Sequence, residues 1–157
     1  MPPRSTRASR VIRARPAEIY QAFMDPDALV SLPPGDMTGT IHEFERRAGG
    51  GYRMSLFYPE HDQISRGKTS EREDMVTVRV LELVPARRIV QSVTFHTTDP
   101  DLAGEMTMVW TIEQLSDGSE VTVLCQDLPP GLRPEDNEAG SRLSLEQLAR
   151  RVERPAG

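Results

Sequence analysis

Residues 133–153 read RPEDNEAGSRLSLEQLARRVE and carry the one long helical pattern of the chain. Pro134 suits a first helical position, because its missing N–H would have no partner there. Leu145, Leu148 and Val152 recur at helical spacing and form an apolar stripe on one face. Toward the N-terminus the same face carries only small or polar residues, namely Asn137, Gly140, Ser141 and Ser144. The pattern predicts a helix whose C-terminal half seals a core, while its N-terminal half borders a cavity or reaches solvent.

Two short helices are predicted near the N-terminus. Residues 9–15 alternate as a short first strand would. Pro16 then opens a helical pattern that Pro26 interrupts, and a second short helix follows as far as Leu32. A break of this kind predicts two short helices at an angle to each other and not one long helix of a bundle.

Strand patterns occupy the chain from Met37 to the last helix. Apolar and polar residues alternate there in about six runs that turn residues separate. The glycine triplet at 49–51 and the turn at 116–118 each predict a hairpin. The run at 81–83 predicts a bulge that would let a sheet bend.

The order of these elements predicts an α+β fold. A strand, two short helices, about six strands and a long helix suggest a curved antiparallel sheet wrapped around the C-terminal helix. The helix and the sheet would each cover the apolar face of the other. Glu45 and Arg47 flank the bend before the glycine triplet, and we expect them to point outward together and fix the turn.

Length, charge and cysteine content limit the class of protein. The 157 residues suffice for one domain, which we expect at residues 9–154 after a basic, flexible arm at 1–8. The net charge of −5 argues against a general nucleic-acid binder, and no apolar run approaches the length of a membrane span. Cys125 is the only cysteine, so no internal disulfide forms and the cytoplasm is the expected compartment.

No arrangement of residues in the sequence predicts catalysis or metal binding. His42, His61 and His96 are far apart and lack the spacing of a zinc or iron site. His42 shares strand parity with Phe44, so it is the one histidine expected to face inward. Cys125 has no histidine nearby and fits a small buried apolar residue. We therefore expect no cofactor, no metal and no catalytic residue.

A cavity between the sheet and the last helix is the predicted binding site. Large side chains on the sheet would face small ones on the helix and leave volume between them. Five methionines at strand or mouth positions favour such a cavity, because methionine fills irregular space. The predicted lining comprises Met37, His42, Met54, Leu56, Tyr58, Gln91, Val93, Phe95, Met108 and Trp110 from the strand region, and Asn137, Gly140, Ser141 and Ser144 from the helix.

Four motifs carry a resemblance to a known family. They are PAEIY at 16–20 with the following Asp25-Pro26, FERRAGGGYR at 44–53, ELVPARRIV at 82–90, and DNEAGSRLSLEQLA at 136–149. With these motifs and its element order, the chain resembles the SRPBCC superfamily, which has the START or Bet v 1-like helix-grip fold. Within it, the chain is similar to homologues of the activator of the heat-shock-protein-90 ATPase. Many relatives carry a tryptophan after the second short helix; here residues 30–33 lack it, so a relative's pocket contents do not transfer.

The resemblance implies a fold but leaves three functions open. The one we prefer is a non-enzymatic binder of a small hydrophobic or aromatic molecule in the cavity between sheet and helix. The second is a cyclase-, dehydratase- or hydrolase-like enzyme that uses His42, Tyr58 or Asn137 in the same cavity. The third is an interaction module whose partner is a chaperone, and a second copy of the chain is a further expected partner.

Overall fold

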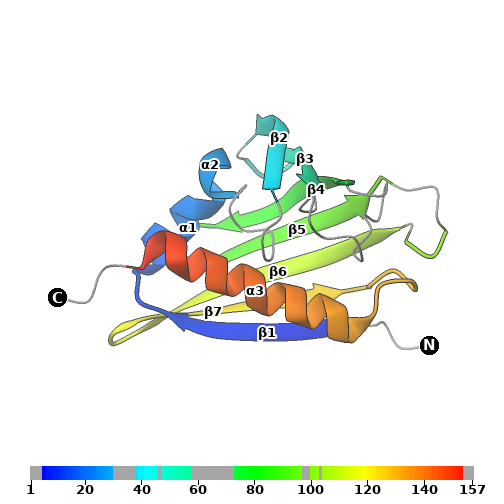
Figure 1. The fold of residues 1–157 in the computed structure, drawn as a ribbon. Coiled ribbons are helices and arrows are strands. Elements are labelled where there is room, and N and C mark those ends of the chain that lie inside the picture. Colours follow the sequence, from blue (N-terminus) through cyan, green and yellow to red (C-terminus); the bar gives the residue numbers. More distant parts are fainter. Residues whose placement is uncertain are drawn as a thin grey trace.

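The computed structural model describes residues 5–29, 38–45, 47–57, 73–96, 100–102 and 104–153 (Figure 1). In chain order the elements are β1 (Ser5–Ile12), α1 (Pro16–Phe23), α2 (Pro26–Leu29), β2 (Thr38–Glu45), β3 (Gly51–Phe57), β4 (Glu73–Val84), β5 (Arg88–Phe95), β6 (Glu105–Leu115), β7 (Gly118–Gln126) and α3 (Pro134–Val152).

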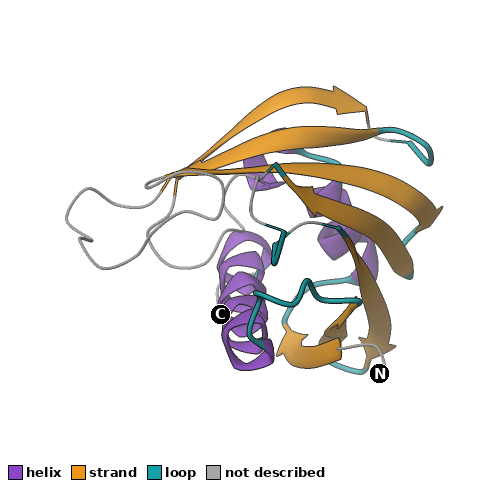
Figure 2. Cartoon of the chain, turned by 90° about the vertical axis from the view of Figure 1, so that its right-hand side faces the viewer, coloured by secondary structure: helices purple, strands orange, loops and turns teal. Residues whose placement is uncertain are grey.

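The described strands form one curved antiparallel sheet in the order β1-β7-β6-β5-β4-β3-β2. Helix α3 runs along β1 and β7, and α1 lies beside its C-terminal end (Figure 1). Viewed nearly along the helix, the sheet arches over it (Figure 2). The predicted α+β helix-grip arrangement is therefore confirmed.

Two irregularities bend the sheet. In β2 the pairing register shifts between His42 and Phe44, where Glu43 has a positive φ of 48°. In β4 the register shifts between Val80 and Glu82, at the position where the sequence predicts a bulge. A bulge adds one unpaired residue to a strand and increases its local twist, so both positions favour curvature.

The turn before β3 contains a glycine that leaves no room for a side chain, and an exposed ion pair. Gly51 has a φ of +150°, and a Cβ there would lie 2.0 Å from the carbonyl oxygen of Val78, so a larger residue would displace β4. Arg47 Nη2 lies 2.7 Å from Glu45 Oε2, and both side chains are exposed. The expectation that these two residues point outward at the turn is confirmed.

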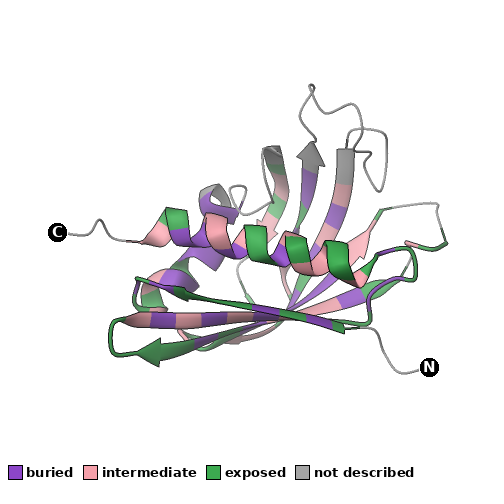
Figure 3. Ribbon diagram, turned by 60° about the horizontal axis from the view of Figure 1, so that its bottom comes forward, coloured by how far each residue is buried: buried purple, intermediate pink, exposed green. Residues whose placement is uncertain are grey.

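Helix α3 follows its sequence pattern. Pro134 lies in its first turn, acidic residues follow it there, and arginines occupy the last turn, as the helix dipole favours. Leu145 and Leu148 are 1% and 0% exposed, and Val152 is half-buried. Exposed and buried residues alternate along the helix as bands (Figure 3). The leucine stripe therefore seals the core as predicted.

Two boundaries differ from the sequence-based expectation. Strand β1 begins at Ser5, which pairs with Gln126, so residues 5–8 belong to the sheet and not to a flexible arm. Thr6 and Ala8 are buried, which explains why the strand extends so far. Helix α2 ends at Leu29, and the remainder of the predicted helix lies outside the described residues. No helix in the described part of the chain is long and apolar enough to cross a membrane.

Candidate ligand-binding site

Helix α3 identifies the concave face of the sheet. Ser141 of the helix contacts Cys125 of β7, with Oγ and Sγ 3.8 Å apart. Cys125 pairs with Met108 of β6, which in turn pairs with Gln91 of β5, so these side chains share the face that α3 covers. By the same register, the concave face from β3 to β6 carries Tyr52, Met54, Val76, Val78, Val80, Leu83, Ile89, Gln91, Val93, Phe95, Met106, Met108, Trp110 and Ile112. The structure thus brings together Met54, Gln91, Val93, Phe95, Met108 and Trp110 of the predicted lining.

A buried hydrogen-bond network lies on this face. Trp110 Nε1 donates to Gln91 Oε1 at 3.1 Å, and both side chains are buried. Since the indole N–H can only donate, the amide oxygen of Gln91 must face Trp110. The side chain of Gln91 also forms a hydrogen bond with the phenol of Tyr52. Phe23 of α1 packs against Trp110 with ring centroids 5.0 Å apart, so α1 holds one end of the network.

Burial controls the protonation of Tyr52. It raises the pKa of the phenol far above its ordinary value, and the hydrogen bond with Gln91 lowers that pKa by a smaller amount. The phenol therefore stays protonated at physiological pH and is a neutral hydrogen-bonding group.

Apolar side chains beside the network are only half-buried. Ile41 pairs with buried Met54, and the ring centroid of Phe44 lies 5.7 Å from that of Tyr52, so both side chains belong to the concave face. The half-buried apolar residues of this face include Ile41, Phe44, Phe95 and Met108. The concave face therefore keeps accessible apolar surface next to a fixed polar group.

Asn137 and Ser141 contact the sheet instead of lining open space. Thr6 Oγ1 donates to Asn137 Oδ1, and Ser141 is buried against Cys125. Burial raises the pKa of the Cys125 thiol, and hydrogen bonds with Ser141, Thr6 and Asn137 lower it by less. This cluster fastens the N-terminal half of α3 to β1 and β7.

Gly140 and Ser144 lie on a neighbouring flank of α3 and are half-buried. Arg151 follows Ser144 by two helical turns and shares this flank. Its Nη2 lies 3.8 Å from Asp25 Oδ2, in the link between α1 and α2. The flank therefore turns toward the side of the molecule on which α2 and strands β3 to β5 lie (Figure 1).

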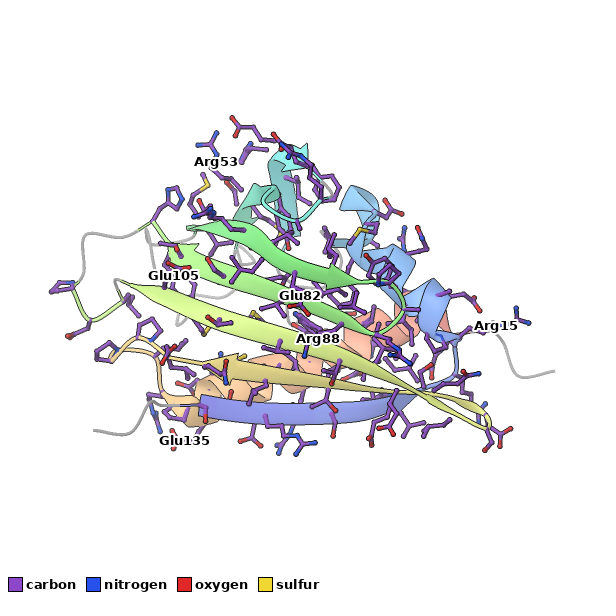
Figure 4. All side chains as sticks on the ribbon, turned by 180° about the vertical axis from the view of Figure 1, so that it is seen from behind. Arg15, Arg53, Glu82, Arg88, Glu105 and Glu135 are labelled. Carbon is purple, nitrogen blue, oxygen red and sulfur yellow. The ribbon has the colours of Figure 1, made fainter. Side chains whose placement is uncertain are left out.

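His42 lies on the opposite, convex face, so the expectation that it faces inward is wrong. It pairs with exposed Arg53, and its Nε2 lies 2.9 Å from Ser55 Oγ. Strict alternation would place His42 and Phe44 on one face, but the bulge at Glu43 reverses the parity between them. Figure 4 looks onto the convex face, where Arg53 is labelled.

Three predicted lining residues fall outside the described side chains. Met37 and Tyr58 lie outside the described residues, and Leu56 is described only as a position of β3 with the parity of Met54. Met75, one of the five methionines expected near the cavity, lies on the convex face, where Ser55 Oγ donates to its Sδ at 3.5 Å.

Of the polar groups that an enzyme would use, the two that the structure describes lie on opposite faces of the sheet. His42 is on the convex face, and Asn137 is engaged by Thr6 on the concave one. Tyr58 lies outside the described residues. Among the residues that the structure describes, no three His, Cys, Asp or Glu side chains are grouped to hold a metal ion.

Two contributors to the site, Tyr52 and Thr6, are absent from the predicted lining. Tyr52 has the same parity as Met54, so alternation along β3 was a usable signal for it. Thr6 had no such signal, because the pattern begins the first strand only at residue 9.

The structure also contains a cleft of about 590 Å³ away from the concave face. It lies between the start of α1 and the β6–β7 turn, and its lining includes Arg13, Arg15, Leu115 and Asp117. The cleft contains none of the predicted lining residues.

Solved structures share this fold over most of the present chain. The chain is 31% identical to protein CV1439 from Chromobacterium violaceum, with a TM-score of 0.83 and coverage of 98% of this chain and 100% of that one. Mll3558 from Rhizobium loti shows the same fold at 21% identity, with a TM-score of 0.73 and coverage of 96% and 97%. DynU16, from the dynemicin biosynthetic locus, has a TM-score of 0.64 at 19% identity; the match covers 93% of this chain and 46% of DynU16. No curated protein sequence matches the chain.

The family assignment rests on nearly the whole domain. A family model described as activator of Hsp90 ATPase homolog 1-like protein matches residues 13–153. That span begins just after β1 and ends just after α3, so it contains every other strand and helix of the fold. The chain therefore belongs to the activator of Hsp90 ATPase homolog 1-like family, which is of the SRPBCC type.

Proposed function

We propose that the chain binds a small hydrophobic or aromatic molecule on its concave face, between strands β3 to β6 and the flank of α3 that carries Gly140 and Ser144. The observation that carries this proposal is the set of half-buried apolar side chains around the buried Gln91 network. Binding sites for small molecules combine mostly apolar walls with a few fixed polar groups. The concave face has this composition.

An uncharged fluorescent probe, N-phenyl-1-naphthylamine, tests the proposal. Its emission should rise on binding, and the purified protein should carry a small molecule that native mass spectrometry retains and denaturing conditions release. Ser144→Leu places a larger side chain on the half-buried flank and should weaken probe binding at least about tenfold. Ala139→Leu adds the same side chain at an exposed position of the same helix and is the matched control.

Two results would refute the proposal. One is a protein that retains no molecule and leaves the probe emission unchanged. The other is equal binding by Ser144→Leu and Ala139→Leu, since that would place the probe away from this flank of α3.

A role in modulating a chaperone is the second candidate, and the family description supports it. The ATPase rate of a purified Hsp90-type chaperone, measured with and without the protein, tests this role. A rate that does not change at a saturating concentration of the protein argues against it.

A further inference from the structure

Within the described part of the chain, the polar network of the concave face has a hydrogen-bond donor to spare. Gln91 Oε1 accepts from Trp110, so its amide N–H groups point away from Trp110 and one donates to the Tyr52 oxygen. A phenol that accepts in this way still has its own O–H to donate. Within the described part of the chain, Gln91 is the hydrogen-bond partner of the Tyr52 hydroxyl.

Apolar surface lies on both sides of this donor. Half-buried Phe44 packs against the Tyr52 ring, and half-buried Met108 pairs with Gln91 across β5 and β6. A flat apolar molecule that contacts both would pass over the phenol. Methionine and aromatic side chains are suited to such a contact, because both pack well against rings.

Among the side chains that the structure describes on the concave face from β3 to β6, none carries a positive charge to receive an anion. The described side chains of the concave face from β3 to β6 are apolar or neutral. Arg151, which shares the flank of Gly140 and Ser144, has a carboxylate partner in Asp25. Placing an unpaired carboxylate on such a surface is strongly unfavourable. The raised pKa of Tyr52 agrees with this, because it shows that the surroundings also disfavour a phenolate.

We propose that the ligand is an uncharged aromatic molecule bearing a hydrogen-bond-accepting oxygen, such as a ketone, and that the Tyr52 hydroxyl donates to that oxygen. This inference rests on the proposed function and specifies its ligand class. Tyr52 is then a specificity-determining residue, while Gln91 and Trp110 orient it.

Three probes with one ring system separate the contribution of apolar contact from those of an accepting oxygen and of a negative charge. They are 2-ethylnaphthalene, 2-acetylnaphthalene and 2-naphthoate. Their dissociation constants are measured by equilibrium dialysis for the unaltered protein and for Tyr52→Phe. We expect the ketone to bind about 3- to 10-fold more tightly than the hydrocarbon, the usual effect of one neutral hydrogen bond. The carboxylate should bind most weakly. Tyr52→Phe should abolish the preference for the ketone and leave hydrocarbon binding unchanged.

Tyr20→Phe is the matched control, since Tyr20 is also buried but belongs to α1. It should keep the preference for the ketone. If the unaltered protein binds the hydrocarbon as tightly as the ketone, or Tyr52→Phe keeps the preference, the inference is wrong while the proposed function stands. If none of the three probes binds, both are wrong. Should Tyr52→Phe fail to fold, the affinities of the unaltered protein test the inference. The order ketone, hydrocarbon, carboxylate from tightest to weakest supports it, and any other order contradicts it.

Discussion

The leucine stripe of α3 allows a quantitative test of the fold. Leu148 is 0% exposed and faces the core between the helix and the sheet. Leu148→Ala removes three carbon atoms, which at about 0.8 kcal/mol per buried methylene amounts to about 2.4 kcal/mol. The unfilled space adds to this, because helix and sheet relax only partly around it. We therefore expect a total loss of about 3–5 kcal/mol in the free energy of unfolding.

Leu143→Ala provides the control for this loss. Leu143 lies on the same helix and undergoes the same chemical change, but it is 43% exposed. Its replacement should change the free energy of unfolding by about 0.5 kcal/mol or less. Urea unfolding followed by circular dichroism and by Trp110 fluorescence measures both variants, and coincident curves support two-state analysis. Equal losses for the two variants, or a loss below about 0.5 kcal/mol for Leu148→Ala, would show that the buried face of α3 is wrongly assigned.

Three further predictions follow from the described contacts. Ser141→Leu should lower the free energy of unfolding by about 1–3 kcal/mol, because the new side chain meets Cys125 where the present hydroxyl lies 3.8 Å from the thiol; unchanged stability in urea would reveal empty space there. Replacing Glu45 and Arg47 together by Gln should cost about 1 kcal/mol or less and leave probe affinity unchanged, since their ion pair is exposed; a loss of affinity in dialysis at unchanged stability would contradict this. The Cys125 thiol should not react with Ellman's reagent at pH 8 until urea unfolds the chain, because burial both shields it and raises its pKa; rapid reaction of the folded protein would disprove the buried placement.

The fold was predictable because its main signals are local. The leucines at 145 and 148 reveal the buried face of α3 through helical spacing alone, and the proline at 134 marks its start. Alternation likewise assigns Gln91 and Trp110 to one face of their strands. Such periodicity depends on backbone geometry and needs no knowledge of what packs opposite.

The position of His42 was not predictable from alternation. Its assignment required that β2 stay regular as far as Phe44, whereas Glu43 adopts a positive φ and forms a bulge. A glutamate gives no warning of this conformation, which is more often taken by glycine, asparagine or aspartate. One unrecognised bulge was enough to place a candidate ligand-binding residue on the wrong side of the sheet.

The role of the small polar residues on α3 was predictable only in part. A helix face with Asn137 and Ser141 can border a cavity or meet polar partners, and the sequence of the helix does not distinguish the two. The partners are Thr6, 131 residues from Asn137, and Cys125, 16 residues from Ser141. The two partners lie side by side only through the β1–β7 pairing. Contacts of this kind can be predicted only when the pairing register of the strands is known.

The contacts that hold α3 in place and the proposed ligand-binding surface lie on different parts of the helix and the sheet. The C-terminal half of the helix is held by buried leucines, and the N-terminal half by the polar cluster on Thr6 and Cys125. Neither set of contacts uses the flank of Gly140 and Ser144, so changes on that flank should alter binding without loosening the helix. The sheet shows a similar division between packed and accessible side chains. Phe23 covers Trp110 at one end of the hydrogen-bond network, whereas Met108, which pairs with Gln91, stays half-buried. A fold of this kind can hold a rigid polar group next to open apolar surface, which is the combination that selective recognition of an uncharged aromatic molecule requires.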